Sequence, residues 1–153
     1  MTPHKITAAL AISEQYKSYE AIDNVLDRLR WCRNKFGYMQ QDVANLLGIE
    51  RSQYVAYEGG YTDYIPKEIV DKLASIYNVP VTDFLDDYNY LLYYGQGKLI
   101  REYRESLGMR KQEFANSMGI DRNSLRCWET EKKRISKDSY EKFFRGVILR
   151  NKR

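Results

Sequence analysis

Two short runs of polar side chains carry most of the chemistry that this sequence offers. Arg51-Ser52-Gln53 begins three residues after Gly48, and Arg122-Asn123-Ser124 begins three residues after Gly119. An arginine fork or a carboxamide can form paired hydrogen bonds with a flat polar edge. The two runs therefore indicate recognition by directional hydrogen bonding.

Residues suited to catalysis or to metal binding are scarce. Cys32 and Cys127 lie far apart without a Cys-x-x-Cys pattern, and the single histidine, His4, stands near the N-terminus. A zinc site would lack ligands, neither cysteine has a histidine to activate it, and the acidic residues form no recognised catalytic motif. We expect no enzyme activity, no catalytic residue, no metal and no cofactor.

The composition is that of a folded chain. Of the 153 residues, 43% are hydrophobic and 14% aromatic, which is too high for a disordered protein. No stretch approaches the roughly 20 apolar residues that a membrane span requires. The apolar run over residues 6–12 is followed by charged residues and lacks a cleavage site, which argues against a signal peptide. We expect a cytoplasmic protein that does not associate with membranes.

The net charge is distributed unevenly along the chain. The overall value of +4 combines about −4 over residues 1–95 with about +8 over residues 96–153. The basic half is suited to binding a polyanion such as a nucleic acid, and the acidic half is less suited to such a partner. The charge predicts that the two halves contribute unequally.

A repeat explains the equal spacing of the two polar runs. Residues 29–58 align without a gap on residues 100–129 at a shift of 71, and 10 of the 30 positions are identical. Such agreement indicates a duplicated unit. The identical pairs are Arg30/Arg101, Arg33/Arg104, Gly37/Gly108, Gln41/Gln112, Ala44/Ala115, Asn45/Asn116, Gly48/Gly119, Ile49/Ile120, Arg51/Arg122 and Glu58/Glu129.

Each copy reads as a series of short helices, so the predicted fold class is all-α. Apolar residues recur at helical spacing, and the glycines at 48 and 119 suit sharp junctions between helices. The expected helices are 22–36, 40–47, 51–58 and one opened by Pro66 in the first copy, then 99–107, 111–118, 122–130 and one after Ser136 in the second. A further helix over about 4–17 is expected at the N-terminus.

Four segments are expected along the chain. The predicted boundaries are an N-terminal helical extension over 1–20, a first domain over 21–87, a Tyr-rich linker over 88–97 and a second, basic domain over 98–153. The linker is too apolar to be a flexible spacer, so we expect it to pack between the domains or at an oligomer contact.

A short helix, a glycine turn and a second helix with polar leading residues form the helix-turn-helix pattern. The segments GYMQQDVANLLGIERSQYVAYEGG (37–60) and GMRKQEFANSMGIDRNSLRCWE (108–129) resemble the XRE family of phage-repressor-like DNA-binding domains. The resemblance implies two tandem repressor-like domains of four to five short helices each. It also implies a double-stranded DNA partner and a transcription regulator of bacterial or phage type that reads the major groove.

The resemblance also assigns roles to individual residues. The first three residues of each recognition helix would reach base edges, the next turn would approach a thymine methyl or a phosphate, and the start of the preceding helix would meet phosphate. The lysines after the second recognition helix would flank the phosphate backbone or form a solvated turn. The candidate DNA-binding residues are Gln40, Arg51, Ser52, Gln53, Ala56, Lys111, Arg122, Asn123, Ser124, Arg126, Cys127, Lys132 and Lys133.

Two charged pairs match a family pairing of the first helix with the third. Arg33 with Glu58, and Arg104 with Glu129, are expected to be structural ion pairs, with solvent-facing side chains as the alternative. The family's Ser/Thr cap at the second helix is missing in both copies, where Met39 and Arg110 stand.

An alternative function stays open. The first copy has Glu50 at the edge that would face DNA, and a carboxylate there repels phosphate. A helix-turn-helix fold could then serve protein interaction, as in an antitoxin-like or adaptor protein, with weak or no DNA binding. A homodimer or a protein partner could use the N-terminal helix and the Tyr-rich linker.

Overall fold

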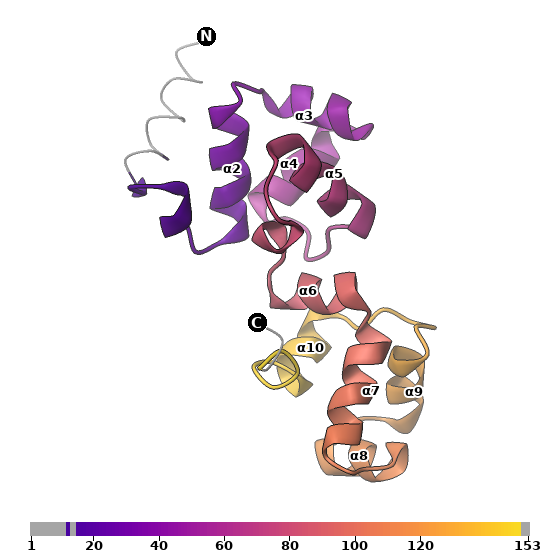
Figure 1. Ribbon diagram of the computed structural model, residues 1–153. Coiled ribbons are helices and arrows are strands. Elements are labelled where there is room, and N and C mark those ends of the chain that lie inside the picture. The colour runs from indigo at the N-terminus through magenta and orange to yellow at the C-terminus, as the bar shows by residue number, and fades with distance from the viewer. Residues whose placement is uncertain (1–11, 13–14, 151–153) are drawn as a thin grey trace. The chain divides into compact units, whose positions relative to one another are not determined.

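The computed structural model describes Ile12 and residues 15–150, and this part of the chain divides into two compact units. Unit 1 ends at Asp86 and unit 2 begins at Asp87. Within the described residues the secondary structure is entirely helical, with nine α-helices and two short 3-10 helices (Figure 1). The all-α prediction is confirmed. The helix expected over 4–17 lies largely outside the described residues.

In the described part of unit 1, four α-helices are framed by two 3-10 turns. Helices α3 and α4 begin and end within one residue of their predicted bounds, because the apolar positions and the glycines mark both ends. The elements are η1 (Tyr19–Ala21), α2 (Val25–Lys35), α3 (Gln40–Leu47), α4 (Arg51–Gly59), α5 (Lys67–Tyr77) and η2 (Val81–Phe84).

The core of unit 1 forms where α2, α3, α4 and α5 pack together. Apolar side chains at helical spacing turn inward from each helix, and burial of this surface stabilises the unit. Tyr54 of α4 is fully buried in this core, so the third helix is fixed from its inner face. The most deeply buried residues are Ile22, Leu29, Val43, Ala44, Leu47, Tyr54, Val70, Leu73 and Phe84.

The described part of unit 2 contains five α-helices. They are α6 (Asp87–Tyr94), α7 (Gln96–Ser106), α8 (Lys111–Met118), α9 (Arg122–Glu129) and α10 (Lys137–Phe143). The bounds of α8 agree with the prediction, whereas α7 begins three residues earlier than expected. The side chain of Ser136 caps α10 by accepting a hydrogen bond of 3.1 Å from the backbone N–H of Ser139.

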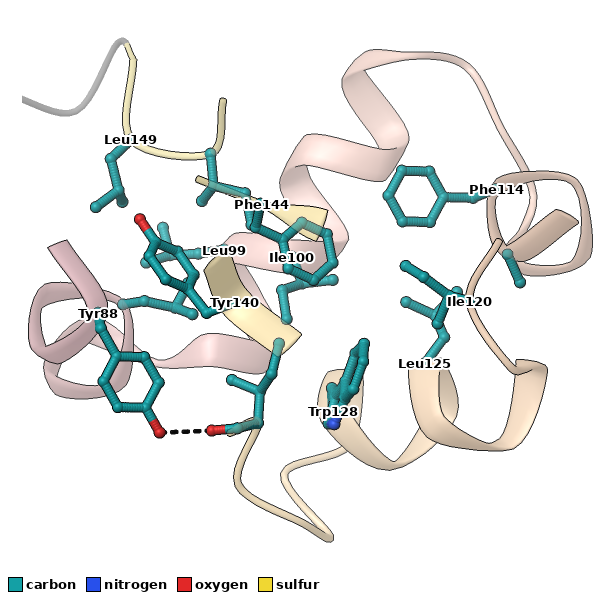
Figure 2. Close-up of a cluster of buried hydrophobic side chains, with 14 residues drawn as sticks. Tyr88, Leu99, Ile100, Phe114, Ile120, Leu125, Trp128, Tyr140, Phe144 and Leu149 are labelled. Atoms are coloured by element: carbon teal, nitrogen blue, oxygen red, sulfur yellow. Dashed lines mark hydrogen bonds between the residues drawn. The ribbon is translucent and has the colours of Figure 1, made fainter. Parts of the chain in front are cut away.

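The tyrosine-rich segment expected as a linker over 88–97 lies within unit 2. It forms α6 and the first turn of α7, and Tyr88 and Leu91 turn from one face of α6 into the core. The hydroxyl of Tyr88 donates a hydrogen bond of 2.6 Å to the carbonyl of Ile135, drawn as the dashed line in Figure 2. This segment differs from the expected linker because Tyr88 and Leu91 are buried in the core of unit 2, to which the segment belongs.

The core of unit 2 is rich in aromatic rings. Phe114, Trp128, Tyr140 and Phe144 come from α8, α9 and the C-terminal segment and converge with aliphatic side chains from α7 (Figure 2). The rings of Phe114 and Phe144 stack with centroids 6.4 Å apart, and Trp128 meets Phe144 edge-on at 6.2 Å. This packing fixes the inner face of α9, which leaves its outer face free to carry polar residues.

The helix-turn-helix junctions of the two units have the same backbone conformation. Gly48 has φ 71° and Gly119 has φ 68°, a left-handed conformation that glycine adopts without a Cβ penalty. The next amide closes the turn in both cases: Ile49 donates to the carbonyl of Ala44 at 3.0 Å and Ile120 to that of Ala115 at 2.9 Å. The repeat in sequence is therefore a repeat in structure.

None of the helices that the structure describes is long and apolar enough to cross a bilayer.

Candidate nucleic-acid interface

Helix α9 of unit 2 presents its polar leading residues to solvent. The carboxylate of Asp121 caps the helix by accepting a hydrogen bond of 3.0 Å from the backbone N–H of Ser124. Arg122 and Asn123 follow directly and are exposed, while Ser124 is half-buried. Among the described residues Arg122 forms neither an ion pair nor a side-chain hydrogen bond. Its guanidinium is therefore available to an external partner.

In the next turn of α9, Arg126 is exposed and Cys127 is buried. Arg126 is exposed, and its Nη2 donates a hydrogen bond of 3.0 Å to Oδ1 of Asn123. Cys127 is only 4% exposed, so the expectation that it lines the groove is wrong. Its counterpart in unit 1, Ala56, is half-buried.

In unit 1 the leading residues of α4 are engaged with their own unit. Nη2 of Arg51 donates a hydrogen bond of 3.3 Å to Oε1 of Gln40, at the start of α3. Oε1 of Gln53 accepts a hydrogen bond of 3.0 Å from the backbone N–H of Glu50. Ser52 is exposed. Two of the three candidate base-reading residues in unit 1 therefore already have partners.

The start of the second helix differs between the units in charge and in capping. Gln40 of α3 corresponds to Lys111 of α8, which is exposed and has no ion pair among the residues that the structure describes. In unit 1 Asp42 supplies the cap that Met39 lacks, accepting a hydrogen bond of 2.7 Å from the backbone N–H of Met39. In unit 2 Arg110 provides no side-chain cap.

Both expected ion pairs are present, each joining the first helix of the motif to its third. Arg33 donates from Nε and Nη2 to the carboxylate of Glu58, with both distances at 2.8 Å. Burial alone would lower the pKa of Arg33, but the hydrogen bonds and the charge of Glu58 outweigh it and the pKa is raised. Each carboxylate thereby holds its recognition helix against the helix that opens the motif.

The same geometry recurs in unit 2. Nη2 of Arg104 lies 3.0 Å from Oε1 of Glu129, with side chains only 9% and 2% exposed. The remaining guanidinium nitrogen donates to a backbone carbonyl in both units, that of Met109 at 2.8 Å and that of Tyr38 at 3.1 Å. The pairs are buried and fully engaged, which excludes the alternative of solvent-facing side chains.

The loop after α9 has exposed lysine side chains and a backbone that is fixed by hydrogen bonds. Lys132 and Lys133 are exposed, and both backbone amides donate to the carbonyl of Cys127, at 2.9 and 3.2 Å. Gln96 of α7 is 2% exposed and contributes three further hydrogen bonds to this region. Sequence reasoning missed Gln96 because it lies four residues before the aligned repeat begins.

The sequence comparisons agree with this geometry. A family model described as a helix-turn-helix domain matches residues 27–90, and a second described as helix-turn-helix matches residues 100–145. The chain contains two helix-turn-helix domains of the XRE type in tandem. The resemblance that the repeated motif carries is thereby confirmed.

Two curated proteins are similar to part of the chain. The chain is 42% identical over 48 residues to the transcriptional repressor RstR of the cryptic phage CTXphi in Vibrio cholerae, covering 31% of this chain and 42% of RstR. It is 44% identical over 59 residues to the SPbeta prophage-derived HTH-type transcriptional regulator YonR of Bacillus subtilis, covering 39% of this chain and 53% of YonR. The chain thus spans about half the length of these relatives. No solved structure matches it significantly.

No group of three or more His, Cys, Asp or Glu side chains in the described part of the chain is placed to hold a metal ion. Tyr54 and Trp128 are core residues, 0% and 8% exposed. The candidate surface is the one that the exposed polar residues of α8, α9 and the following loop form.

Proposed function

We propose that this chain is a sequence-specific double-stranded DNA-binding transcription regulator that reads the major groove chiefly with helix α9. The observation that carries the proposal is the set of exposed, unpaired cations around this recognition helix. Arg122 leads α9, Lys111 opens α8, and Lys132 and Lys133 follow α9. A DNA duplex offers hydrogen-bond acceptors on the base edges in the groove, which suit Arg122, and on the phosphates along the rims of the groove, which suit the lysines.

The first residues of α9 would contact the base edges. A free guanidinium at Arg122 can form a bidentate contact with guanine, and the carboxamide of Asn123 can contact an adjacent base. Oδ1 of Asn123 already accepts a hydrogen bond from Arg126, which leaves the NH₂ group of the amide as its donor to a base. Ser124 is partly covered by the Asp121 cap and contributes less.

The lysines would bind the phosphate backbone of the DNA. Each lysine placed near a phosphate releases about one counterion from the duplex, so affinity depends steeply on salt. Lys111 has a further role that unit 1 suggests. In unit 1 the equivalent position holds Gln40, which accepts a hydrogen bond from Arg51. Unit 2 has a second cation at that position, so Lys111 and Arg122 can share an external anion instead.

Unit 1 reads DNA weakly in this scheme. Arg51 and Gln53 bond within their own unit, and the carboxylate of Glu50 stands at the start of α4. An external acceptor must compete with these bonds and overcome the repulsion from Glu50. Ser52 and Ala56 remain as minor contacts. A bipartite site with one strong and one weak element follows from this difference between the units.

Selection from a random duplex library at moderate salt, followed by sequencing of the bound DNA, tests the proposal. One enriched motif with a strong and a weak element is the expected result. Two equally strong elements would contradict the unequal roles of the units. No enrichment would reject sequence-specific binding.

A second candidate function for unit 1 is protein interaction, as in antitoxin-like or adaptor proteins. The observation that favours it is the satisfied recognition helix of unit 1 together with Tyr61, which follows α4 and is 81% exposed. A large exposed aromatic ring is typical of a protein contact. Substitution of Tyr61 by Ser would then leave DNA affinity unchanged and weaken self-association or partner binding.

A further inference from the structure

The loop between α9 and α10 is anchored along its whole length within unit 2. At its start, Glu131 donates its backbone N–H to the carbonyl of Trp128 at 3.3 Å. At its end, Ile135 is fully buried, and its carbonyl accepts the hydrogen bond from Tyr88. Exposed loops rich in lysine are usually mobile. This one is anchored at both ends.

Gln96 links the two ends of the loop. Its Nε2 donates to the carbonyl of Trp128 at 3.1 Å and to the carbonyl of Lys133 at 2.6 Å. Its Oε1 accepts from the backbone N–H of Ile135 at 2.8 Å. A single buried carboxamide therefore satisfies three backbone groups, on the last turn of α9 and on both sides of Arg134.

A second contact holds the loop beside the first turn of α7. The backbone N–H of Gly97 donates to Oε1 of Glu131 at 2.8 Å. A Cβ at position 97 would lie 2.4 Å from the carbonyl oxygen of Glu129, so only glycine allows α7 to approach α9 this closely. Glu131 itself adopts a left-handed backbone with φ 61°. The loop conformation is imposed by these contacts.

We infer that Gln96 is a positioning residue for DNA binding, which holds Lys132 and Lys133 in a preformed site for the duplex phosphate backbone. This inference rests on the proposed function. The lysines supply the charge, and Gln96 removes the entropy cost of ordering them when DNA arrives. The repeat places Val25 at the position of Gln96, and a valine side chain cannot form such hydrogen bonds, so unit 1 cannot hold a loop in this way.

A double-mutant cycle tests the inference with the full chain and a duplex selected for tight binding. Gln96→Ala is measured in the natural background and in a Lys132→Ala/Lys133→Ala background. We expect Gln96→Ala to weaken binding roughly tenfold in the first background and less than twofold in the second. Removal of the two lysines should also reduce the salt dependence of log K by about 1.8.

The cycle separates positioning from general stability. Ile148→Ala is the control, because it removes a buried side chain of unit 2 far in sequence from the loop. Its effect on binding should be the same in both backgrounds. An equal loss for Gln96→Ala in both backgrounds, or no loss at all, would overturn the inference. If the unsubstituted chain binds no duplex, the proposed function itself has failed.

A second pair of variants applies where Gln96→Ala does not fold. Glu131 is exposed, and Glu131→Gln and Glu131→Ala remove the same charge. Only glutamine keeps a side-chain oxygen that can accept from Gly97. We expect Glu131→Ala to bind DNA several-fold more weakly than Glu131→Gln. Equal affinity of the two variants would overturn the role of the anchored loop.

Discussion

The guanidinium of Arg104 and the carboxylate of Glu129 face each other across unit 2, with Nη2 and Oε1 3.0 Å apart and both side chains less than a tenth exposed. The pair joins α7 to the end of α9, and Arg104 also donates to the carbonyl of Met109. Position 129 is the last residue of the recognition helix. The pair therefore links the orientation of that helix to the integrity of the unit.

Breaking this pair should destabilise unit 2 strongly. Glu129→Ala leaves a buried guanidinium without its counter-charge, which costs about 3–5 kcal/mol of unfolding free energy. Urea unfolding followed by Trp128 fluorescence in a Trp31→Phe background measures it. The exposed pair of Lys98 and Glu102, 4.0 Å apart, is the control, and Glu102→Gln should cost less than about 1 kcal/mol. A similarly small cost for Glu129→Ala would contradict the structural role.

The two leading arginines should differ in their contribution to DNA binding. Arg122→Ala should weaken specific binding by about 1–3 kcal/mol, because a free guanidinium loses its base contact. Arg51→Ala should cost less, because Arg51 is already bonded to Gln40. Titration of both variants with the selected duplex by fluorescence anisotropy checks the order. A larger loss at Arg51 would mean that unit 1 is the dominant reader.

Lys111, the first residue of α8, should contribute to the salt dependence of DNA affinity. Lys111→Gln gives unit 2 the residue of unit 1, and we expect the slope of log K against log salt to become less steep by about 0.9. The reciprocal change, Gln40→Lys, should make it steeper. Affinities measured across a series of salt concentrations give both slopes. An unchanged slope for Lys111→Gln would show that Lys111 does not meet a phosphate.

Unit 1 should lose stability in acid through Asp27. Burial acts to raise the pKa of this carboxyl, but hydrogen bonds from Tyr16 and Asn24 and the charge of Arg30 lower it below its usual value. A lowered pKa in the folded state stabilises the unit above the pKa of the unfolded chain, and this stability disappears as the pH falls through the folded value.

The Asp27→Asn variant measures that contribution. Thermal unfolding of unit 1 at pH 7 and at pH 3 should differ less in Asp27→Asn than in the unsubstituted chain, because the titrating group is gone. Asp71→Asn, on the exposed face of α5, serves as the comparison. An equal acid sensitivity of Asp27→Asn and the unsubstituted chain would show that Asp27 contributes nothing.

Neither cysteine should react while the chain is folded. Burial raises the pKa of Cys32 to about 11, so only about one molecule in a thousand holds a thiolate there at pH 8. Cys127 is equally hidden, at 4% exposed. Iodoacetamide labelling followed by mass spectrometry should show no adduct in buffer and two in urea. Rapid labelling of Cys127 in buffer would show that its thiol is exposed, as expected of a residue at the DNA-facing surface.

Much of the molecule could be predicted from sequence because its signals are local. The shift of 71, the apolar spacing and the glycines at 48 and 119 predicted the helical class and placed α3, α4, α8 and α9 within a residue or two. The charge pairs were found through repetition, since Arg33 with Glu58 and Arg104 with Glu129 recur at one shift. Helical periodicity and turn chemistry act over a few residues, so one sequence suffices to show them.

Tertiary structure alone decided which side chains are free. The same position in the repeat holds a half-buried Ala56 and a buried Cys127, and the sequence placed Cys127 in the groove. Packing of the aromatic core of unit 2 determines how α9 is rotated, which no local pattern records. The assignment of residues 88–97 also needed the fold, because an apolar segment can pack on either neighbour.

The sequence by itself determined the repeat, the helices and the polar residues that lead each recognition helix. The tertiary structure decided that Arg51 is engaged by Gln40 whereas Arg122 is free, and that Gln96 anchors the basic loop. Those relationships join residues 11 to 39 positions apart. Hydrogen bonds over such separations depend on how the helices pack, and packing is a property of the folded unit as a whole.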